Sequence, residues 1–462
     1  MPGPIGLTLA ISIASLSTIS VTPATAPREE IVNTGSGPAA PTLPEARSQT
    51  TGPAQPSRQI EESRPGLSCK AGRNGGATDV GVTATSIRLA STVVQDGPAA
   101  SLLGDSPKAM QAVVNRVNRA GGICGRTLDL EIVNDGFDAQ RGQVFLRNFI
   151  NSDRYFALPV VPSAEGLSSA IASGDISRAG MPVVGSDGMR IEQYEDPWVW
   201  PVATATVSTM RAMVKYAVDV RRSKTFGIVW DSKYKFGVEG KDAFIDMVKR
   251  KGGRIITDVA LDPDQPSYAS EAQRFNEACA QDACDTVALL LLPDAASKWL
   301  SRRPVMGKLL TSGAQTLFTD DFARACVVAS GNDCNGFVVW TGFNPPVGTL
   351  SSLPDVARFI DDVRSIDPQV DIRNQFLEGA YLGMEVFVEA LRRVGADLTR
   401  ARLKATLDSM RFESDLSGPL VWRTGNHKAN PRAQAFSLVA INRTFTGWRK
   451  DQAGWIEDPG ER

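Results

Sequence analysis

The strongest constraint on the fold is a repeated alternation of strand and helix patterns between residues 79 and 292. Apolar strand patterns stand at 86–92, 128–134 and 155–161, and again at 224–230, 254–260 and 285–292, with amphipathic helix patterns between them. Strands that alternate with helices form parallel sheets through right-handed crossovers. The sequence therefore predicts an α/β protein with two doubly wound parallel-sheet lobes.

Acidic residues follow several of the predicted strands. Asp135 and Asp138 could be taken for an acid pair, but a strand end followed by a helix N-cap explains them without chemistry. Asp320 and Asp321 follow another short strand, at the edge where open α/β folds bind ligands. An N-cap for a helix at 322–330 is the alternative there.

The last third of the chain has a different pattern. Helix patterns follow one another at 353–366, 375–395 and 399–410, and short strands follow at 418–422 and 435–441. Strands after a helical block complete sheets that began earlier, so each lobe is expected to be discontinuous in sequence.

The N-terminal segment has the pattern of a secretory leader. Residues 5–22 form an uncharged aliphatic run, and Ala24 and Ala26 give a small-residue cleavage pattern, which predicts a signal-like leader at 1–26. No positive charge precedes the run, so a weak membrane anchor is the alternative. Residues 27–78 are rich in proline and poor in large apolar residues, which predicts a disordered tether.

Six cysteines are compatible with three disulfides in an exported protein. Cys279 and Cys284 are close in sequence, and so are Cys326 and Cys334, which leaves Cys69 with Cys124. Six reduced core thiols are the alternative. Metal ligation is disfavoured because the chain has no CxxC motif.

No motif for catalysis or cofactor binding is present. The chain has one histidine, His427, in a polar loop where a solvated or hydrogen-bonded side chain is expected. Nucleotide-binding glycine motifs are missing, and 50 basic against 51 acidic residues give no support for nucleic-acid binding. We therefore expect no catalytic residue, no metal and no cofactor.

One stretch, NRAGGICGRTLDLEIVNDGFDA at 118–139, combines a helix stop, a tight turn, a strand and a cap. It resembles the signature of the leucine/isoleucine/valine-binding family of type I periplasmic binding proteins. FGIVWDSKYKFGVEGKDAF resembles the opening of the family's second lobe, and NQFLEGAYLGMEVFVEALRRVG, which contains Tyr381, resembles its late helix. GPLVWRTGNH resembles the strand where the chain returns, and the similarity extends from Val82 to Ile441.

The resemblance implies two lobes joined by a three-segment hinge, near Pro201–Thr206, Gly342–Val347 and Phe412–Gly418. The first lobe would hold 79–203 and 345–414, and the second 204–344 and 415–456. A small molecule would bind between the lobes and be sequestered by hinge closure. The implied partners of this exported monomer are its small-molecule ligand and an ABC transporter permease in the membrane.

The resemblance also implies a ligand site made of two turns on the first lobe and of aromatic and acidic side chains on the second. The turns would receive an amino-acid carboxylate, the aromatic residues would cover the ligand and the acid would accept its ammonium group. The implied residues are Ser163, Ala164, Glu165, Ser186, Asp187, Gly188, Tyr234, Phe236 and Asp321.

Glu165, Asp187 and Asp321 would place three acids in or near one cleft, so a cationic or polyhydroxylated ligand competes with an amino acid. Each could instead be a helix cap that faces solvent. We expect an extracytoplasmic solute-binding protein of an ABC importer that captures a small polar ligand, such as an amino acid or amide. The alternatives are a ligand-sensing module of the same fold, coupled to a regulator without transport, and a hydrolase, for which the only histidine is badly placed.

Overall fold

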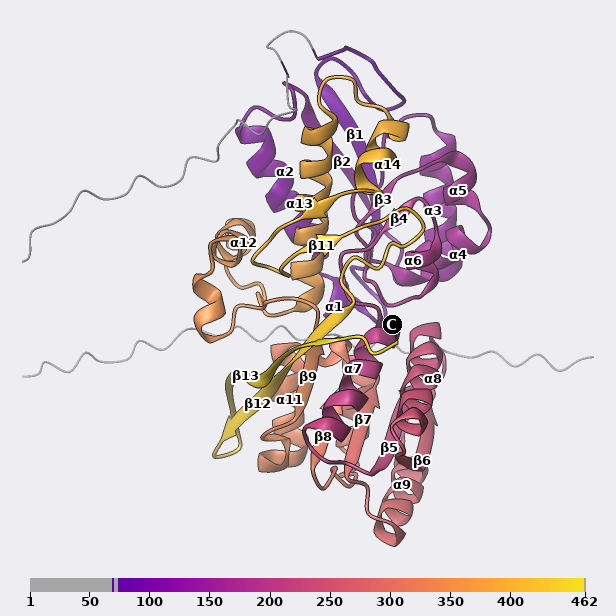
Figure 1. The fold of residues 1–462 in the computed structure, drawn as a ribbon, viewed down its shortest axis with the longest axis vertical. Helices are drawn as coiled ribbons and strands as arrows, with labels where there is room; N and C mark the ends of the chain where they lie inside the picture. Colours follow the sequence, from indigo (N-terminus) through magenta and orange to yellow (C-terminus); the bar gives the residue numbers. More distant parts are fainter. Residues whose placement is uncertain (1–68, 70–73, 461–462) are drawn as a thin grey trace, which may run out of the picture. The chain divides into compact units, whose positions relative to one another are not determined.

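The structure of the chain is a computed structural model that describes residue 69 and residues 74–460. The predicted leader at 1–26 lies outside the described residues, and so does the predicted tether at 27–78 apart from Cys69 and residues 74–78. None of the helices in the described part is long and apolar enough to cross a bilayer. From Ser86 onward strands and helices alternate as predicted (Figure 1).

The first lobe is built around a short parallel sheet. Strands β1 and β2 pair in parallel, isolated bridges join β1 to Ala157 and Leu158 to β3, and β3 pairs in parallel with β4. The predicted strand at 155–161 is thus a buried extended segment with isolated bridges. The elements are β1 (Ser86–Val93), α1 (Ala100–Leu103), α2 (Ser106–Arg119), β2 (Thr127–Asn134), α3 (Ala139–Asn151), α4 (Ala164–Ala172), α5 (Asp175–Ala179), β3 (Val183–Val184), α6 (Glu192–Glu195) and β4 (Val199–Trp200).

The second lobe is built around a seven-stranded sheet of order β13-β12-β9-β8-β7-β5-β6. Strands β5 to β9 are parallel, and β12 is antiparallel to β9 and β13. The strands are β5 (Thr225–Asp231), β6 (Arg254–Leu261), β7 (Thr286–Leu290), β8 (Leu310–Gly313), β9 (Val338–Thr341), β12 (Arg432–Ile441) and β13 (Thr444–Glu457). The helices are α7 (Thr206–Asp219), α8 (Lys235–Arg250), α9 (Ala269–Gln281), α10 (Pro293–Leu300) and α11 (Asp320–Ser330), with 3-10 turns at Gln315–Leu317 and Gly331–Cys334.

A helical block follows β9 and ends in a short antiparallel pair of strands. Its elements are a 3-10 turn at Gly348–Ser352, α12 (Pro354–Arg364), α13 (Gln375–Val394), α14 (Arg400–Leu407), β10 (Arg411–Phe412) and β11 (Leu420–Val421). Trp422 and Ala429 still pack in the core that α2 and α13 share, whereas Ala433 packs in a core of the second lobe. The predicted lobe boundary at 414–415 would have to move to between Ala429 and Ala433 to match these cores.

Both sheets are covered on their two faces, because successive side chains of a strand point to opposite sides. Leu89 packs with residues of α2 and α13, whereas its neighbour Ala90 packs with residues of α3, α4 and α5. In the second lobe, Ile228 and Val229 of β5 likewise enter different cores. The predicted α/β class with doubly wound, mostly parallel sheets is confirmed.

Three chain segments pass between the lobes and are tied to one another. Thr204 Oγ1 donates a hydrogen bond to Arg432 O at 2.6 Å, and Asn430 Nδ2 donates to Gly342 O at 2.7 Å. The predicted three-segment hinge is confirmed in this form. Its third segment runs through Asn430 and not through Phe412–Gly418, because β11 pairs with β10 and keeps the chain on the first lobe until then.

The three predicted cysteine pairs are present as disulfides: Cys69–Cys124, Cys279–Cys284 and Cys326–Cys334. The sulfur atoms therefore close two short local loops and one long one. The alternative of six reduced core thiols does not hold in the structure.

Candidate functional site

Two polar turns of the first lobe follow parallel strand segments, as predicted. In the first turn, Ser163 precedes α4 and its hydroxyl donates to Asp135 Oδ1 at 2.9 Å. Burial raises the pKa of Asp135. Asp138 caps α3 by accepting a hydrogen bond from the backbone of Arg141, which confirms the capping interpretation. The Ser163 hydroxyl is thus already used inside the protein, next to the buried Ala164.

The second turn, after β3, is held together by Gln193. Ser186 Oγ donates to Gln193 Oε1 at 2.8 Å, and Gln193 Nε2 donates to Asp187 Oδ1 at 3.0 Å. Gly188 has a φ of 70°, and a Cβ there would lie 2.5 Å from the hydroxyl oxygen of Tyr194. A residue with a side chain would therefore be strained at this position.

A small cavity lies beside this turn. Its walls include Ser186, Asp187, Phe343, Gln375 and Phe376. The cavity volume is about 10 Å³, which is room for about one water molecule. Burial raises the pKa of Asp187 to about 7, and its Oδ2 has no hydrogen-bond partner among the described residues. A larger ligand would have to displace the side chains around this cavity.

The predicted aromatic residues lie where the second lobe meets the first. Tyr234 precedes α8 and Phe236 lies in its first turn, both buried, with ring centroids 6.3 Å apart. The Tyr234 ring meets the edge of Phe137, a first-lobe residue, at a centroid distance of 5.2 Å. Phe236 shares an apolar core with Ala164 and Met189 of the first lobe. These contacts place both aromatic residues at the lobe interface.

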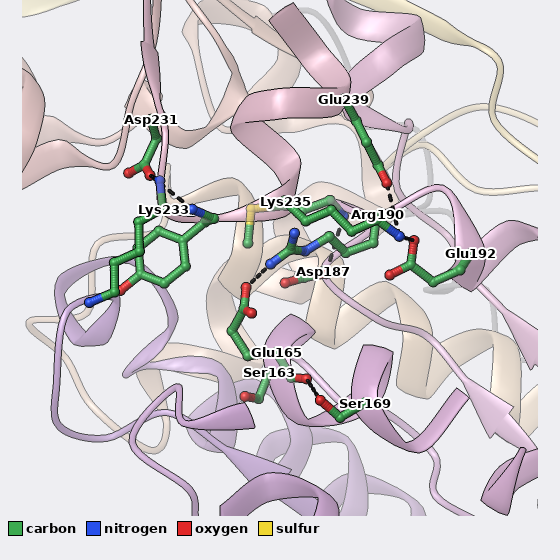
Figure 2. Close-up of polar contacts among 12 residues, drawn as sticks. Ser163, Glu165, Ser169, Asp187, Arg190, Glu192, Asp231, Lys233, Lys235 and Glu239 are labelled. Carbon is green, nitrogen blue, oxygen red and sulfur yellow. Dashed lines mark hydrogen bonds and ion pairs between the residues drawn. The ribbon is translucent and has the colours of Figure 1, made fainter. Parts of the chain in front are cut away.

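Polar contacts also join the first turns of α8 to the start of α6 (Figure 2). Lys235 Nζ donates to Glu192 Oε2 at 2.7 Å, and its distance to Glu239 Oε1 is 3.2 Å. The backbone N–H of Ile191 donates to Glu239 Oε2 at 3.1 Å. The interface between the lobes is therefore both apolar and charged.

Two buried charged residues at this interface were not predicted from the sequence. Arg190 forms an ion pair with Glu165, and burial lowers its pKa to about 10. Asp231, at the carboxyl end of β5, accepts hydrogen bonds from the backbone of Lys233 and Tyr234, and burial raises its pKa to about 6. Asp231 had a sequence signal, because it directly follows the predicted strand at 224–230, whereas the sequence around Arg190 does not indicate burial of its side chain.

Asp321 does not lie with the other predicted site residues. Its side chain is 85% exposed, because it is in the first turn of α11 and points away from the core. The buried acid is its neighbour Asp320, which accepts a hydrogen bond from Trp448 Nε1 at 2.9 Å and pairs with Arg373. The helix cap is Thr319, so neither aspartate has that role. The structure therefore corrects the prediction that Asp321 lies in the ligand site between the lobes.

The remaining candidate for chemistry has a structural role. His427 is buried, its Nδ1 lies 2.6 Å from Val199 O, and its ring stacks on Trp200. The sequence predicted a solvated or a hydrogen-bonded side chain for His427, and the structure shows the hydrogen-bonded one. Within residue 69 and residues 74–460, no group of three or more His, Cys, Asp or Glu side chains is placed to hold a metal ion.

Two lobes linked by three segments, with polar turns of one lobe against the helix start of the other, define a two-lobed binding protein. A profile of the periplasmic binding protein family matches residues 86–444, and the chain belongs to this family. No curated protein matches the sequence of the chain.

Solved structures of low sequence identity share the fold. A fatty acid ABC transporter substrate-binding protein from Thermomonospora curvata has a TM-score of 0.67 at 18% identity, covering 83% of this chain and 95% of that chain. The branched-chain amino acid transporter substrate-binding protein LivJ from Streptococcus pneumoniae, in complex with isoleucine, has a TM-score of 0.64 at 14% identity, with coverages of 79% and 99%. A solute-binding protein from R. palustris, in complex with benzoate, has a TM-score of 0.63 at 15% identity, with coverages of 80% and 98%.

Proposed function

We propose that this protein is the extracytoplasmic solute-binding component of an ABC importer and captures a small polar ligand, such as an amino acid or amide, between its lobes. One observation carries the proposal. Met189, in the turn after β3 of the first lobe, shares an apolar core with Tyr234 and Phe236 of the second lobe, and the adjacent Ile191 N–H donates to Glu239 of α8. Small-molecule sites combine apolar walls with a few placed polar groups.

The related structures support binding of small solutes in general, since two of them are complexes with isoleucine and benzoate and a third is the substrate-binding protein of a fatty acid ABC transporter. The proposed ligand site comprises the turns at 163–165 and 186–188 together with Tyr234 and Phe236. Asp321 is left out because its side chain is exposed. No cofactor, metal or catalytic step belongs to this proposal.

Location and partners follow from the same proposal. Membership of the periplasmic binding protein family and three disulfides support an oxidising compartment outside the cytoplasm. We propose that the protein acts as a monomer and delivers its ligand to a membrane permease. The net charge of −1 gives no reason to expect nucleic acid as a partner.

The test is to purify the full chain from its native host and to identify any bound solute by native mass spectrometry. That solute should bind the purified protein in a ratio of one to one, as measured by calorimetric titration. Disruption of the gene should abolish uptake of the same solute. Binding with unchanged uptake would favour the sensing alternative, and a protein that retains and binds no solute would contradict the proposal.

A further inference from the structure

Arg190 is a charged side chain that the fold has removed from water. It is 1% exposed; its Nη2 forms an ion pair with Glu165, whereas Nε and Nη1 have no hydrogen-bond partner among the described residues. A guanidinium group has five N–H donors and remains protonated at neutral pH. Buried donors without acceptors cost free energy, so this position favours an additional anionic acceptor.

The partner that Arg190 has in the structure is Glu165 (Figure 2). Glu165 lies in the first turn of α4, and its side chain is 19% exposed, in contrast to the 1% of Arg190. The pair is therefore asymmetric, because Glu165 has access to solvent and Arg190 has none. A glutamate side chain is long enough to turn outward while the backbone of α4 stays in place.

The surroundings of Arg190 combine apolar walls with unsatisfied acids. Met189, Tyr234 and Phe236 belong to one apolar core. Asp187 and Asp231 each keep one carboxylate oxygen without a hydrogen-bond donor in the described part of the chain. A ligand with a carboxylate and a donor group would satisfy both the guanidinium and these acids, whereas a purely cationic ligand would leave Arg190 with its present contacts.

We propose that Arg190 binds a carboxylate group of the ligand and that Glu165 is an internal competitor, which the ligand carboxylate displaces. This inference rests on the proposed function and adds the chemical class of the ligand. Carboxylate and guanidinium form two parallel charge-assisted hydrogen bonds, which amide analogues cannot reproduce. The competing explanation is a permanent structural ion pair between Arg190 and Glu165.

The experiment compares acids with their amides on the purified full chain by calorimetric titration. The probes are isoleucine and isoleucine amide, benzoate and benzamide, and octanoate and octanamide, together with putrescine and glucose as a cationic and a neutral solute. We expect at least one acid to bind about a hundredfold more tightly than its amide, since two charged hydrogen bonds are lost. Glu165→Gln should tighten binding of that acid about tenfold, because the competitor loses its charge.

Removal of Arg190 alone would leave Glu165 unpaired and could prevent folding, so the main variant is the neutral pair Arg190→Gln/Glu165→Gln. It should fold and bind acid and amide equally. Arg178→Gln, which removes an arginine whose side chain is 69% exposed, should leave the acid preference unchanged.

Equal affinity of wild type for acid and amide, or binding of putrescine or glucose alone, would overturn the inference while solute binding stands. An acid preference that persists in the Arg190→Gln/Glu165→Gln variant would also overturn the inference. If none of the probes and no solute recovered from the native host binds, the proposed function itself fails, and the inference fails with it.

Discussion

At the residue scale, the burial of Glu378 in α13 has the clearest electrostatic cost to stability. Its side chain is fully buried, neither carboxyl oxygen has a hydrogen-bond partner among the described residues, and burial raises its pKa well above the usual value. Glu385 on the same helix is 12% exposed and pairs with Arg116 and Arg358. The two glutamates therefore make opposite contributions to stability.

Glu378→Met should raise the free energy of unfolding by about 1–2 kcal/mol at neutral pH, because an apolar side chain of similar size replaces an unsatisfied polar one. Glu385→Met should lower it by about 1 kcal/mol, because Arg116 and Arg358 lose one carboxylate partner but keep Asp362 and Asp355. Urea denaturation of both variants measures the difference. A loss of stability in Glu378→Met would show that its carboxyl group has a stabilising role.

The raised pKa of Asp187 predicts a pH dependence of stability. The folded pKa of about 7 lies above the unfolded value of about 3.9, so the folded state binds an extra proton between these values. Stability should therefore rise by about 2–3 kcal/mol from this residue as pH falls from 8 to 5. Asp187→Asn should lose this component, and the exposed Asp321→Asn should keep it. Identical pH profiles of Asp187→Asn and wild type would contradict the prediction.

Single residues are also where prediction from the sequence was weakest. The turns that contain Ser163 and Ser186 were located correctly, because they follow buried strand patterns. The choice between Asp320 and Asp321 depended on the first residue of α11, which sequence patterns do not define to one position. Arg190 was missed, because nothing in the local sequence indicates that its guanidinium is buried against another lobe.

At the element scale, the hinge depends on close packing of its three segments. A Cβ on Gly342 would lie 2.1 Å from Thr204 Oγ1 and 2.9 Å from Asn430 Nδ2. Gly342→Ala should therefore lower the free energy of unfolding by about 2–3 kcal/mol, since overpacking forces neighbours to move.

Thr204→Ala alone should cost about 1 kcal/mol, because it loses the hydrogen bond to Arg432 O. In the double variant the steric conflict is relieved, so the combined loss should be smaller than the sum of the single losses. A double-mutant cycle by thermal denaturation measures this coupling. Strictly additive losses would mean that Gly342 and Thr204 do not contact each other in the hinge.

Most elements could be predicted because their apolar spacing is clear. Helix α2 buries Met110, Val113, Val114 and Val117 at the expected spacing. Strand β13 was missed because it lies at the sheet edge and most of its side chains remain at least partly exposed. Its turn, Asn442-Arg443, has φ values of 50° and 59°, as two-residue hairpin turns require.

At the scale of the whole molecule, the disulfides differ in how much chain they close. Cys69–Cys124 spans 55 residues and Cys279–Cys284 spans 5. The chain-entropy relation predicts a loss of about 4 kcal/mol for Cys69→Ser/Cys124→Ser and of about 2 kcal/mol for Cys279→Ser/Cys284→Ser. Guanidinium denaturation of the two variants tests this order, and equal losses would contradict it.

The sequence predicted the fold class of the whole molecule more completely than it predicted the residues of the candidate site. Alternating patterns are local and indicate parallel sheets, whereas the lobe interface forms between residues far apart in sequence, such as Phe137 and Tyr234. The third hinge segment was misplaced for the same reason, because the pairing of β11 with β10 is not visible in the apolar pattern.

The most direct test of the central claim, that the two lobes bind a small solute, is thermal unfolding of the full chain against a broad panel of metabolites. A ligand at about a hundred times its dissociation constant should stabilise the protein by about 2.7 kcal/mol. We predict a clear rise in melting temperature with one chemical class of solute and its loss in a Ser186→Ala/Asp187→Asn variant. An unchanged melting temperature with every solute, or an equal rise in that variant, would contradict the account.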